Sequence, residues 1–262
     1  MNMLEAHRQL KDAIRSGQPV LGLFVRTPAV QVVEVLGQSG ADCIVLDAEH
    51  APFGAAELDH CILAGRSVGL PVLVRLGEPR PANILQVLDM GAAGIIVPHV
   101  GDARTVAAAI NACHYKNGTR GFSGQHRAAN YGAISGAEYR EASDESIIVI
   151  AQIEDSVGHA NVAEIAAVSD LDAIFVGRAD LAVSMGCDGV DDARVVTAST
   201  DILAAGSNAN MTTGIFLASP GEMGPFRKQG ASLFMIATDQ SLLLDAARDV
   251  ATEFMAASGR TQ

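Results

Sequence analysis

The sequence contains no tryptophan, and aromatic residues occupy only 4% of its 262 positions. Proteins that bind single-stranded nucleic acid usually stack the bases on aromatic side chains, so this shortage argues against such a role. The formal net charge of −12 argues in the same direction, because an acidic surface repels a phosphate backbone. We therefore expect no nucleic-acid partner.

Lysine is also scarce, and none of the three lysines, Lys11, Lys116 and Lys228, ends one of the apolar runs described below. Aldolases that form a Schiff base with their substrate need a lysine held in a desolvated pocket at the active site. The lysine positions therefore argue against covalent imine catalysis.

The chain also lacks long apolar runs and clustered cysteines. No run reaches the roughly 18 residues of a membrane-spanning helix, and the first 17 residues are typical of an amphipathic helix, not of a secretory signal. The cysteines are dispersed, without C-x-x-C spacing, at Cys43, Cys61, Cys113 and Cys187. Because this pattern is typical of reduced thiols, we expect a cytoplasmic protein that binds no membrane.

The chain does have a regular alternation of short apolar runs with helical segments. Apolar runs without polar alternation indicate strands that are buried on both faces of a parallel sheet. The runs lie at 19–25, 41–47, 70–76, 93–100, 147–154, 171–177, 212–218 and 231–237. Eight strand–helix units in this length predict an α/β fold, a (β/α)8 TIM barrel that forms a single domain over residues 1–262.

Residues 116–146 interrupt the alternation with a long polar insertion between the fourth and fifth runs. Connections of this length are usually active-site lids or subunit contacts. Arg120, His126 and Arg127 would then bring positive charge over an acidic barrel mouth. A solvated loop followed by a surface helix is the alternative, and both interpretations stay open.

Charged side chains follow several of the runs where each strand is expected to end. The carboxyl ends of all strands in such a barrel open on the face where catalysis takes place. Glu154 and Asp180 follow the fifth and sixth runs, and two carboxylates with water molecules commonly hold Mg²⁺ or Mn²⁺. Acids in the first turn of a helix also favour its dipole, so each acid alone has a structural explanation.

Arg75 ends the third run, and a buried arginine needs an anionic partner because an unpaired buried charge is costly. A structural carboxylate and an anionic substrate would both serve. Asp47 and His50 follow the second run in the segment LDAEHAP, where a carboxylate can orient an imidazole for acid–base catalysis. Glu49 is a competing candidate for the same task.

The ordered motifs of the chain resemble those of one known family. They are LDAEHAPF, PVLVRL, QVLDMGAAGIIVPHV, GTRGFSGQHRA, AQIEDSVG, IFVGRADLAVSMG and GASLFMIATDQSLL. These motifs are similar to those of the HpcH/HpaI aldolase/citrate lyase family over about residues 18–250. Within that family they look most like the class II, metal-dependent pyruvate aldolases, such as the 4-hydroxy-2-oxoheptanedioate and 2-keto-3-deoxy-sugar-acid aldolases.

The resemblance implies a reaction and an assembly. It implies an aldolase that joins or cleaves a pyruvate-type enolate and an aldehyde in 4-hydroxy-2-oxo acids, with small 2-oxo acids and aldehydes as partners. The cofactor would be a divalent cation, Mg²⁺, Mn²⁺ or Co²⁺. The assembly would be a homohexamer, a trimer of dimers, in which the C-terminal helix is exchanged between partners.

The resemblance also implies roles for individual residues. The metal would be held by Glu154 and Asp180, catalysis would involve Asp47, His50, Arg75 and Asp89, and the substrate pocket would be lined by Arg75, Gln152, Gly177, Ala179 and Leu217. In this scheme Arg75 stabilises the enolate, while His50, positioned by Asp47, acts as acid and base. Asp89 would approach that pair from an adjoining subunit, and Leu217 would touch the aldehyde.

Two features depart from the family pattern, and three other functions stay open. Arg178 stands where the family usually has proline, which would add a cation at the rim, and the segment CDGVDDARVV is shorter than usual. A lyase of CoA thioesters of the citrate lyase beta type is disfavoured by the acidic, lysine-poor composition. An oxaloacetate-type decarboxylase would share the enolate intermediate. A ligand-binding barrel without catalysis is the remaining alternative.

Overall fold

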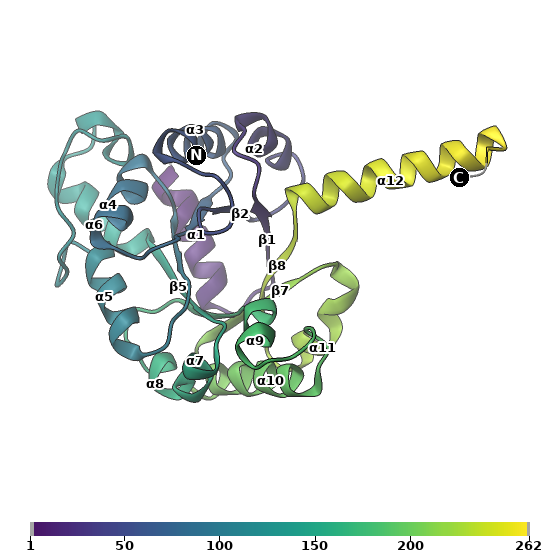
Figure 1. Ribbon diagram of the computed structural model, residues 1–262. Helices are drawn as coiled ribbons and strands as arrows, with labels where there is room; N and C mark the ends of the chain where they lie inside the picture. Colours follow the sequence, from purple (N-terminus) through teal and green to yellow (C-terminus); the bar gives the residue numbers. More distant parts are fainter. Residues whose placement is uncertain (1–2, 261–262) are drawn as a thin grey trace.

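The computed structural model describes residues 3–260 and contains a closed barrel of eight parallel strands in sequence order (Figure 1). The strands are β1 (Val20–Val25), β2 (Cys43–Asp47), β3 (Val72–Arg75), β4 (Gly94–Val97), β5 (Ile148–Ile153), β6 (Ala173–Val176), β7 (Thr212–Leu217) and β8 (Leu233–Thr238). The predicted (β/α)8 TIM barrel is therefore confirmed. The ends of the predicted domain, residues 1–2 and 261–262, lie outside the described residues.

The strand side chains form two apolar layers, because successive residues of a strand point to opposite faces. One layer fills the barrel interior and includes Phe24 and Phe175. The other lies between the strands and the outer helices and includes Val149 and Ile174. Burial on both faces explains why the strands appear in the sequence as continuous apolar runs.

The helices that follow the strands form the outer layer. They are α2 (Val30–Leu36), α3 (Ala55–Val68), α4 (Pro81–Met90), α5 (Ala103–Cys113), α7 (Ser156–Ala160), α8 (Val162–Ala166), α9 (Arg178–Ser184), α10 (Ala193–Asn208), η2 (Pro220–Glu222) and α11 (Met223–Lys228). Gly91 ends α4 with φ 106°, a left-handed conformation that glycine adopts without steric cost. Within residues 3–260, no helix combines the length and the apolar character that crossing a membrane requires.

The first helix, α1 (Met3–Arg15), covers the end of the barrel where the strands begin. Lys11 Nζ donates to the Ile147 carbonyl just before β5, and Thr212 Oγ1 at the start of β7 donates to the Ile14 carbonyl, both over 2.6 Å. Ile14 also belongs to the interior apolar layer. The functional side chains stand at the carboxyl ends of the parallel strands, so they lie on the face opposite α1.

The insertion between β4 and β5 lies beside the barrel. It contains η1 (Arg127–Gly132), which contacts α4, and α6 (Gly136–Ser146), which contacts α1. The surface helix of the second interpretation is therefore present as α6, packed against the first helix of the chain.

The arginines of the insertion are bound by acids on the outer helices. Arg127 Nη2 lies 2.8 Å from Asp59 Oδ2 of α3, and Arg120 Nη2 lies 2.8 Å from Asp89 Oδ1 of α4. Arg120 is only 7% exposed. The expectation that these arginines bring positive charge over the mouth of their own barrel is therefore wrong.

The last helix, α12 (Asp239–Ser258), extends away from the barrel (Figure 1). Its first residue is fixed, because the Asp239 carboxylate accepts hydrogen bonds from the Arg26 and Thr27 backbone N–H groups over 2.7 and 3.1 Å. Farther along, Leu243 and Phe254 are 74% and 57% exposed. The helix thus presents apolar side chains beyond the barrel surface.

Candidate functional site

An ion pair joins the ends of β2 and β3 at the mouth of the barrel. Arg75 Nε and Nη2 donate to Asp47 Oδ1 and Oδ2 over 3.0 and 2.8 Å, and the two residues face each other in the strand register. Arg26 Nε also donates to Asp47, over 2.8 Å. Burial would raise the pKa of Asp47, but the charge and hydrogen bonds of Arg75, with help from Arg26, hold it below its ordinary value. Asp47 is therefore an ionised anchor for Arg75.

The predicted pair of Asp47 and His50 is brought together through the backbone. Asp47 Oδ1 accepts a hydrogen bond from the His50 backbone N–H over 3.2 Å, so the carboxylate fixes the loop. The imidazole instead faces Glu49, whose Oε2 lies 3.8 Å from His50 Nε2. The expected contact between Asp47 and the ring is thus corrected to a backbone contact. The ring is 43% exposed, and its acid–base role stays a prediction.

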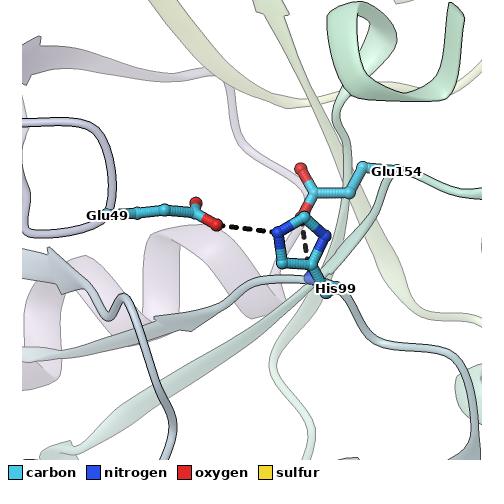
Figure 2. A group of neighbouring side chains, drawn as sticks. All are labelled: Glu49, His99 and Glu154. Carbon is cyan, nitrogen blue, oxygen red and sulfur yellow. Dashed lines mark hydrogen bonds and ion pairs between the residues drawn. The ribbon is translucent and has the colours of Figure 1, made fainter. Parts of the chain in front are cut away.

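Glu49, the competing acid of the sequence, lies between Arg75 and a second histidine. Its Oε2 is 3.3 Å from Arg75 Nε, and its Oε1 is 2.9 Å from His99 Nε2. His99 follows β4, and Figure 2 shows its ring between the carboxylates of Glu49 and Glu154. The carboxyl ends of β2, β3, β4 and β5 therefore contribute to one connected group of charges.

Glu154 follows β5 and is 1% exposed. Its Oε1 accepts a hydrogen bond from the His99 backbone N–H over 2.6 Å and lies 3.2 Å from His99 Nδ1. Its Oε2 accepts a hydrogen bond from the Gln152 side-chain amide. Burial raises the pKa of Glu154, although the hydrogen bonds from His99 and Gln152 act to lower it.

Gly177, at the start of α9, leaves space for this carboxylate. A Cβ at this position would lie 2.8 Å from Glu154 Cβ, 2.9 Å from Glu154 Oε2 and 3.1 Å from Gln152 Nε2. The predicted pocket residues Gln152 and Gly177 are therefore brought together beside Glu154. A side chain here would displace the carboxylate.

The other predicted residues of this region lie around that centre. Asp180 is half-buried in the first turn of α9, and Ala179 beside it is exposed. Leu217 is buried at the end of β7. Asp180 is not a member of the Glu49, His99 and Glu154 cluster, so its role as a metal ligand stays a prediction.

Arg178 does not stand as an added cation at the rim. It is 9% exposed, its Nη2 lies 2.9 Å from Glu222 Oε2, and its guanidinium stacks over the Phe226 ring. The same Glu222 carboxylate accepts hydrogen bonds from the Ala218 and Ser219 N–H groups. The expected extra rim charge is therefore corrected to a neutralised ion pair that ties α9 to the segment after β7.

Asp89 lies on α4, away from the strand ends of its own chain. Its carboxylate binds Arg120 and lies 3.5 Å from His126 Nε2. This acid therefore belongs to the side-chain cluster that anchors the insertion. Its approach to the active site of an adjoining subunit stays a prediction.

The residues present fit a divalent cation. Glu49, His99 and Glu154 each offer a ligand atom, and these atoms lie within 4.8 Å of one another. Two buried acceptor atoms accept no hydrogen bond from any residue in 3–260: Oε2 of Glu49 itself, and Oε1 of Gln152, which neighbours Glu154. A buried acceptor without a donor is costly, and a cation satisfies such atoms.

His99 is the site residue that the sequence reasoning missed. It stands in the run 93–100, whose apolar pattern predicts strand throughout, whereas β4 ends at Val97. The available signal is a polar residue at the end of an apolar run, the same signal that indicates Arg75 and Glu154.

The sequence and the structure are both similar to those of known aldolases and their family. The sequence model of the HpcH/HpaI aldolase/citrate lyase family matches residues 20–246. The chain is 32% identical to a 2-dehydro-3,6-dideoxy-6-sulfogluconate aldolase of Pseudomonas putida, covering 88% of this chain and 90% of the relative. It is 30% identical to a hydroxypyruvate/pyruvate aldolase of Paraburkholderia phytofirmans, covering 93% and 96%. A crystal structure of an HpcH/HpaI aldolase/citrate lyase family protein from Burkholderia cenocepacia J2315 superposes with a TM-score of 0.89 at 30% identity, covering 94% of this chain and 99% of that one.

Proposed function

Since the chain belongs to the HpcH/HpaI aldolase/citrate lyase family and is thus a carbon–carbon lyase, we propose the following reaction. A divalent-metal-dependent aldolase forms or cleaves the bond between the enolate of pyruvate or hydroxypyruvate and an aldehyde. The relatives named as hydroxypyruvate/pyruvate aldolases and as sugar-acid aldolases support this donor and product class. The observation that carries the proposal is the position of Arg75 beside an acceptor-rich cluster that fits a cation.

Cleavage of a 4-hydroxy-2-oxo acid places negative charge on the ketone oxygen. The divalent cation, when bound, supplies a Lewis acid for this oxygen. Arg75 supplies a fixed positive charge, because Asp47 holds two of its nitrogens and the Phe24 ring lies 4.9 Å beneath its guanidinium carbon. Among residues 3–260, its third guanidinium nitrogen, Nη1, has no hydrogen-bond partner, so this nitrogen is available to a substrate oxygen. Preorganised charge of this kind stabilises an enolate without rearrangement during the reaction.

The proton steps fall to His50 in this proposal. Its imidazole is half exposed at the mouth, while its backbone is fixed by Asp47. In the cleavage direction the ring takes the proton of the 4-hydroxyl group as the aldehyde leaves. In the condensation direction it returns that proton to the new alkoxide.

The donor pocket is proposed beside Glu154. Gln152 and the backbone of Gly177 and Ala179 line it, since the absence of a side chain at Gly177 leaves room there. Leu217, at the end of β7, faces the aldehyde part. The ion pair of Arg178 and Glu222 holds the rim of the pocket that would receive the aldehyde.

The proposed assembly is a homohexamer, a trimer of dimers, in which α12 packs on a partner subunit. The exposed apolar side chains of α12 and its projection from the barrel support this arrangement (Figure 1). Several large apolar side chains exposed on one helix are typical of an interaction site.

Proton exchange at C3 of pyruvate in D₂O, followed by NMR, tests the proposed reaction without knowledge of the aldehyde. We expect no exchange by protein treated with EDTA and rapid exchange after addition of Mg²⁺, Mn²⁺ or Co²⁺. Glu154→Gln should lower the rate about 10²-fold or more, because a charged oxygen at the cation is lost. Asp188→Asn, at an exposed residue, is the matched control.

Two results would contradict the proposal. Full exchange by the metal-free protein would remove the cation from the mechanism. Absence of exchange for both pyruvate and hydroxypyruvate with every metal would exclude the proposed donors and favour a thioester substrate.

A further inference from the structure

We propose that His99 Nδ1 is a ligand of the metal ion next to Glu154, and that Glu49 holds the other ring nitrogen in place. This inference rests on the proposed function, because it concerns the same cation. It predicts that the site prefers first-row transition-metal ions such as Mn²⁺ and Co²⁺ to Mg²⁺.

The position of the ring between two acids carries the proposal. His99 Nε2 lies 2.9 Å from Glu49 Oε1, and His99 Nδ1 lies 3.2 Å from Glu154 Oε1 (Figure 2). Metal-binding histidines generally ligate through one nitrogen and donate the other N–H to a carboxylate, which fixes the tautomer. With Nε2–H donated to Glu49, the Nδ1 lone pair is directed to the side of Glu154.

The backbone at His99 holds the ring there although the side chain is 57% exposed. His99 has φ 51°, a left-handed conformation that is uncommon for residues other than glycine, although asparagine, aspartate and histidine adopt it more often than the rest. Its N–H is bound by Glu154 Oε1 over 2.6 Å. The same carboxylate therefore fixes the backbone and faces the ring of one residue.

A buried acceptor beside the cluster gives independent support for a cation. Gln152 is 1% exposed, and its amide nitrogen is bound to Glu154 Oε2. Its oxygen, Oε1, has no donor among residues 3–260. Glu49 Oε2 also accepts no hydrogen bond from the described residues, although Arg75 Nε lies 3.3 Å away. Both acceptors lie on side chains that touch the proposed ligands.

The proposed donor set determines which ion is favoured. Mg²⁺ prefers oxygen ligands in octahedral geometry and retains several waters. Imidazole nitrogen suits transition ions, and affinity for a given site rises from Mn²⁺ through Fe²⁺ to Co²⁺. An imidazole added to carboxylates therefore raises the affinity for Co²⁺ and Mn²⁺ much more than the affinity for Mg²⁺.

Pulsed EPR of the Mn²⁺-loaded full-length protein tests the ligand directly, through the modulation that a coordinated ¹⁴N imposes on the echo. We expect this modulation in the wild type and its loss in His99→Asn. Asparagine is the chosen replacement because it tolerates the left-handed backbone. His50→Asn is the matched control and should keep the modulation.

Titration calorimetry with Co²⁺ and Mg²⁺ provides the second measurement. His99→Asn should lower the Co²⁺ affinity at least about tenfold and change the Mg²⁺ affinity much less. Equal losses for both ions, or ¹⁴N modulation that persists in His99→Asn, would overturn the proposal. If the wild type exchanges pyruvate protons with a metal but shows no ¹⁴N modulation, the aldolase function stands and the role of His99 falls. If the wild type binds no divalent cation, both fall.

Discussion

The Arg75 guanidinium is held by both oxygens of the Asp47 carboxylate, across the register that pairs the ends of β3 and β2. The acid at the end of β2 therefore positions the residue that stabilises the enolate, as well as the loop that carries His50. Because Arg75 is 5% exposed, its geometry depends on this partner.

Asp47→Asn is expected to destabilise the protein and to displace Arg75. Asp47→Asn removes the charge that accepts two hydrogen bonds from a buried guanidinium and leaves Glu49 as its nearby acid, which costs up to about 3–5 kcal/mol of unfolding free energy. Urea denaturation at pH 7 measures this change, with the exposed Asp188→Asn as control. Equal stability of the two variants would show that Asp47 is not the anchor of Arg75.

Gly177→Ala is expected to damage the site through a steric clash. The new Cβ would lie 2.8 Å from Glu154 Cβ, so the carboxylate or the backbone of α9 has to shift. We expect a loss of about 1–3 kcal/mol in stability, with weaker binding of the divalent cation. Thermal unfolding and calorimetry measure both quantities. Gly189→Ala is the control, because its Cβ meets no atom within 4 Å, and it should leave both unchanged.

His7 lies in α1, the helix that covers the end of the barrel where the strands begin. It makes the free energy of unfolding depend on pH. It is 5% exposed, and burial, assisted by the charge of Arg66, lowers the pKa of His7 to about 4 from 6.5. Between these values the unfolded chain binds a proton that the folded chain excludes. The stability contributed by neutral His7 is therefore complete above pH 6.5 and is lost as the pH falls toward 4.

The size of this effect follows from the shift. Over that window the wild type should lose about 3 kcal/mol more unfolding free energy than His7→Gln, measured by urea denaturation at a fixed protein concentration. His60→Gln, at an exposed position, should follow the wild type. Parallel pH profiles for the wild type and His7→Gln would show that His7 is not the group responsible.

The exposed face of α12 is expected to hold subunits together. Leu243→Glu with Phe254→Glu places two charges on apolar positions that are 74% and 57% exposed in the single chain. Light scattering after size exclusion should show smaller assemblies with unchanged helix content, because burying a charge in an interface is unfavourable. Arg248→Ala on the same helix is the control. An unchanged mass of the double variant would exclude α12 from the subunit contacts.

The strands and the elements that position the site were predictable, because burial on both faces leaves a direct record in the sequence. The pattern indicates Glu154 and Arg75 because each stands at the end of such a run. Strand ends were less well defined, and His99 was lost because the run 93–100 extends beyond β4, which ends at Val97.

The side chains that pair with the site residues could not be predicted from the sequence alone. The pairing of Asp47 with Arg75, 28 residues later, depends on the register between β2 and β3. Arg178 is neutralised by Glu222, 44 residues later, which no local pattern indicates. Long-range register and ion pairs of this kind are properties of the closed barrel and not of any segment.

The position of α1, across the end of the barrel where the strands begin, has a consequence for synthesis of the chain. This helix is synthesised before the strands that it covers, and the Ile14 carbonyl accepts a hydrogen bond from Thr212, 198 residues later in the chain. At about 5–20 residues per second, residue 212 emerges roughly 10–40 s after Ile14. During that time Leu10 and Ile14 have no barrel interior to enter. During synthesis these apolar side chains are therefore exposed in a way that they are not in the folded barrel, and such exposure favours aggregation.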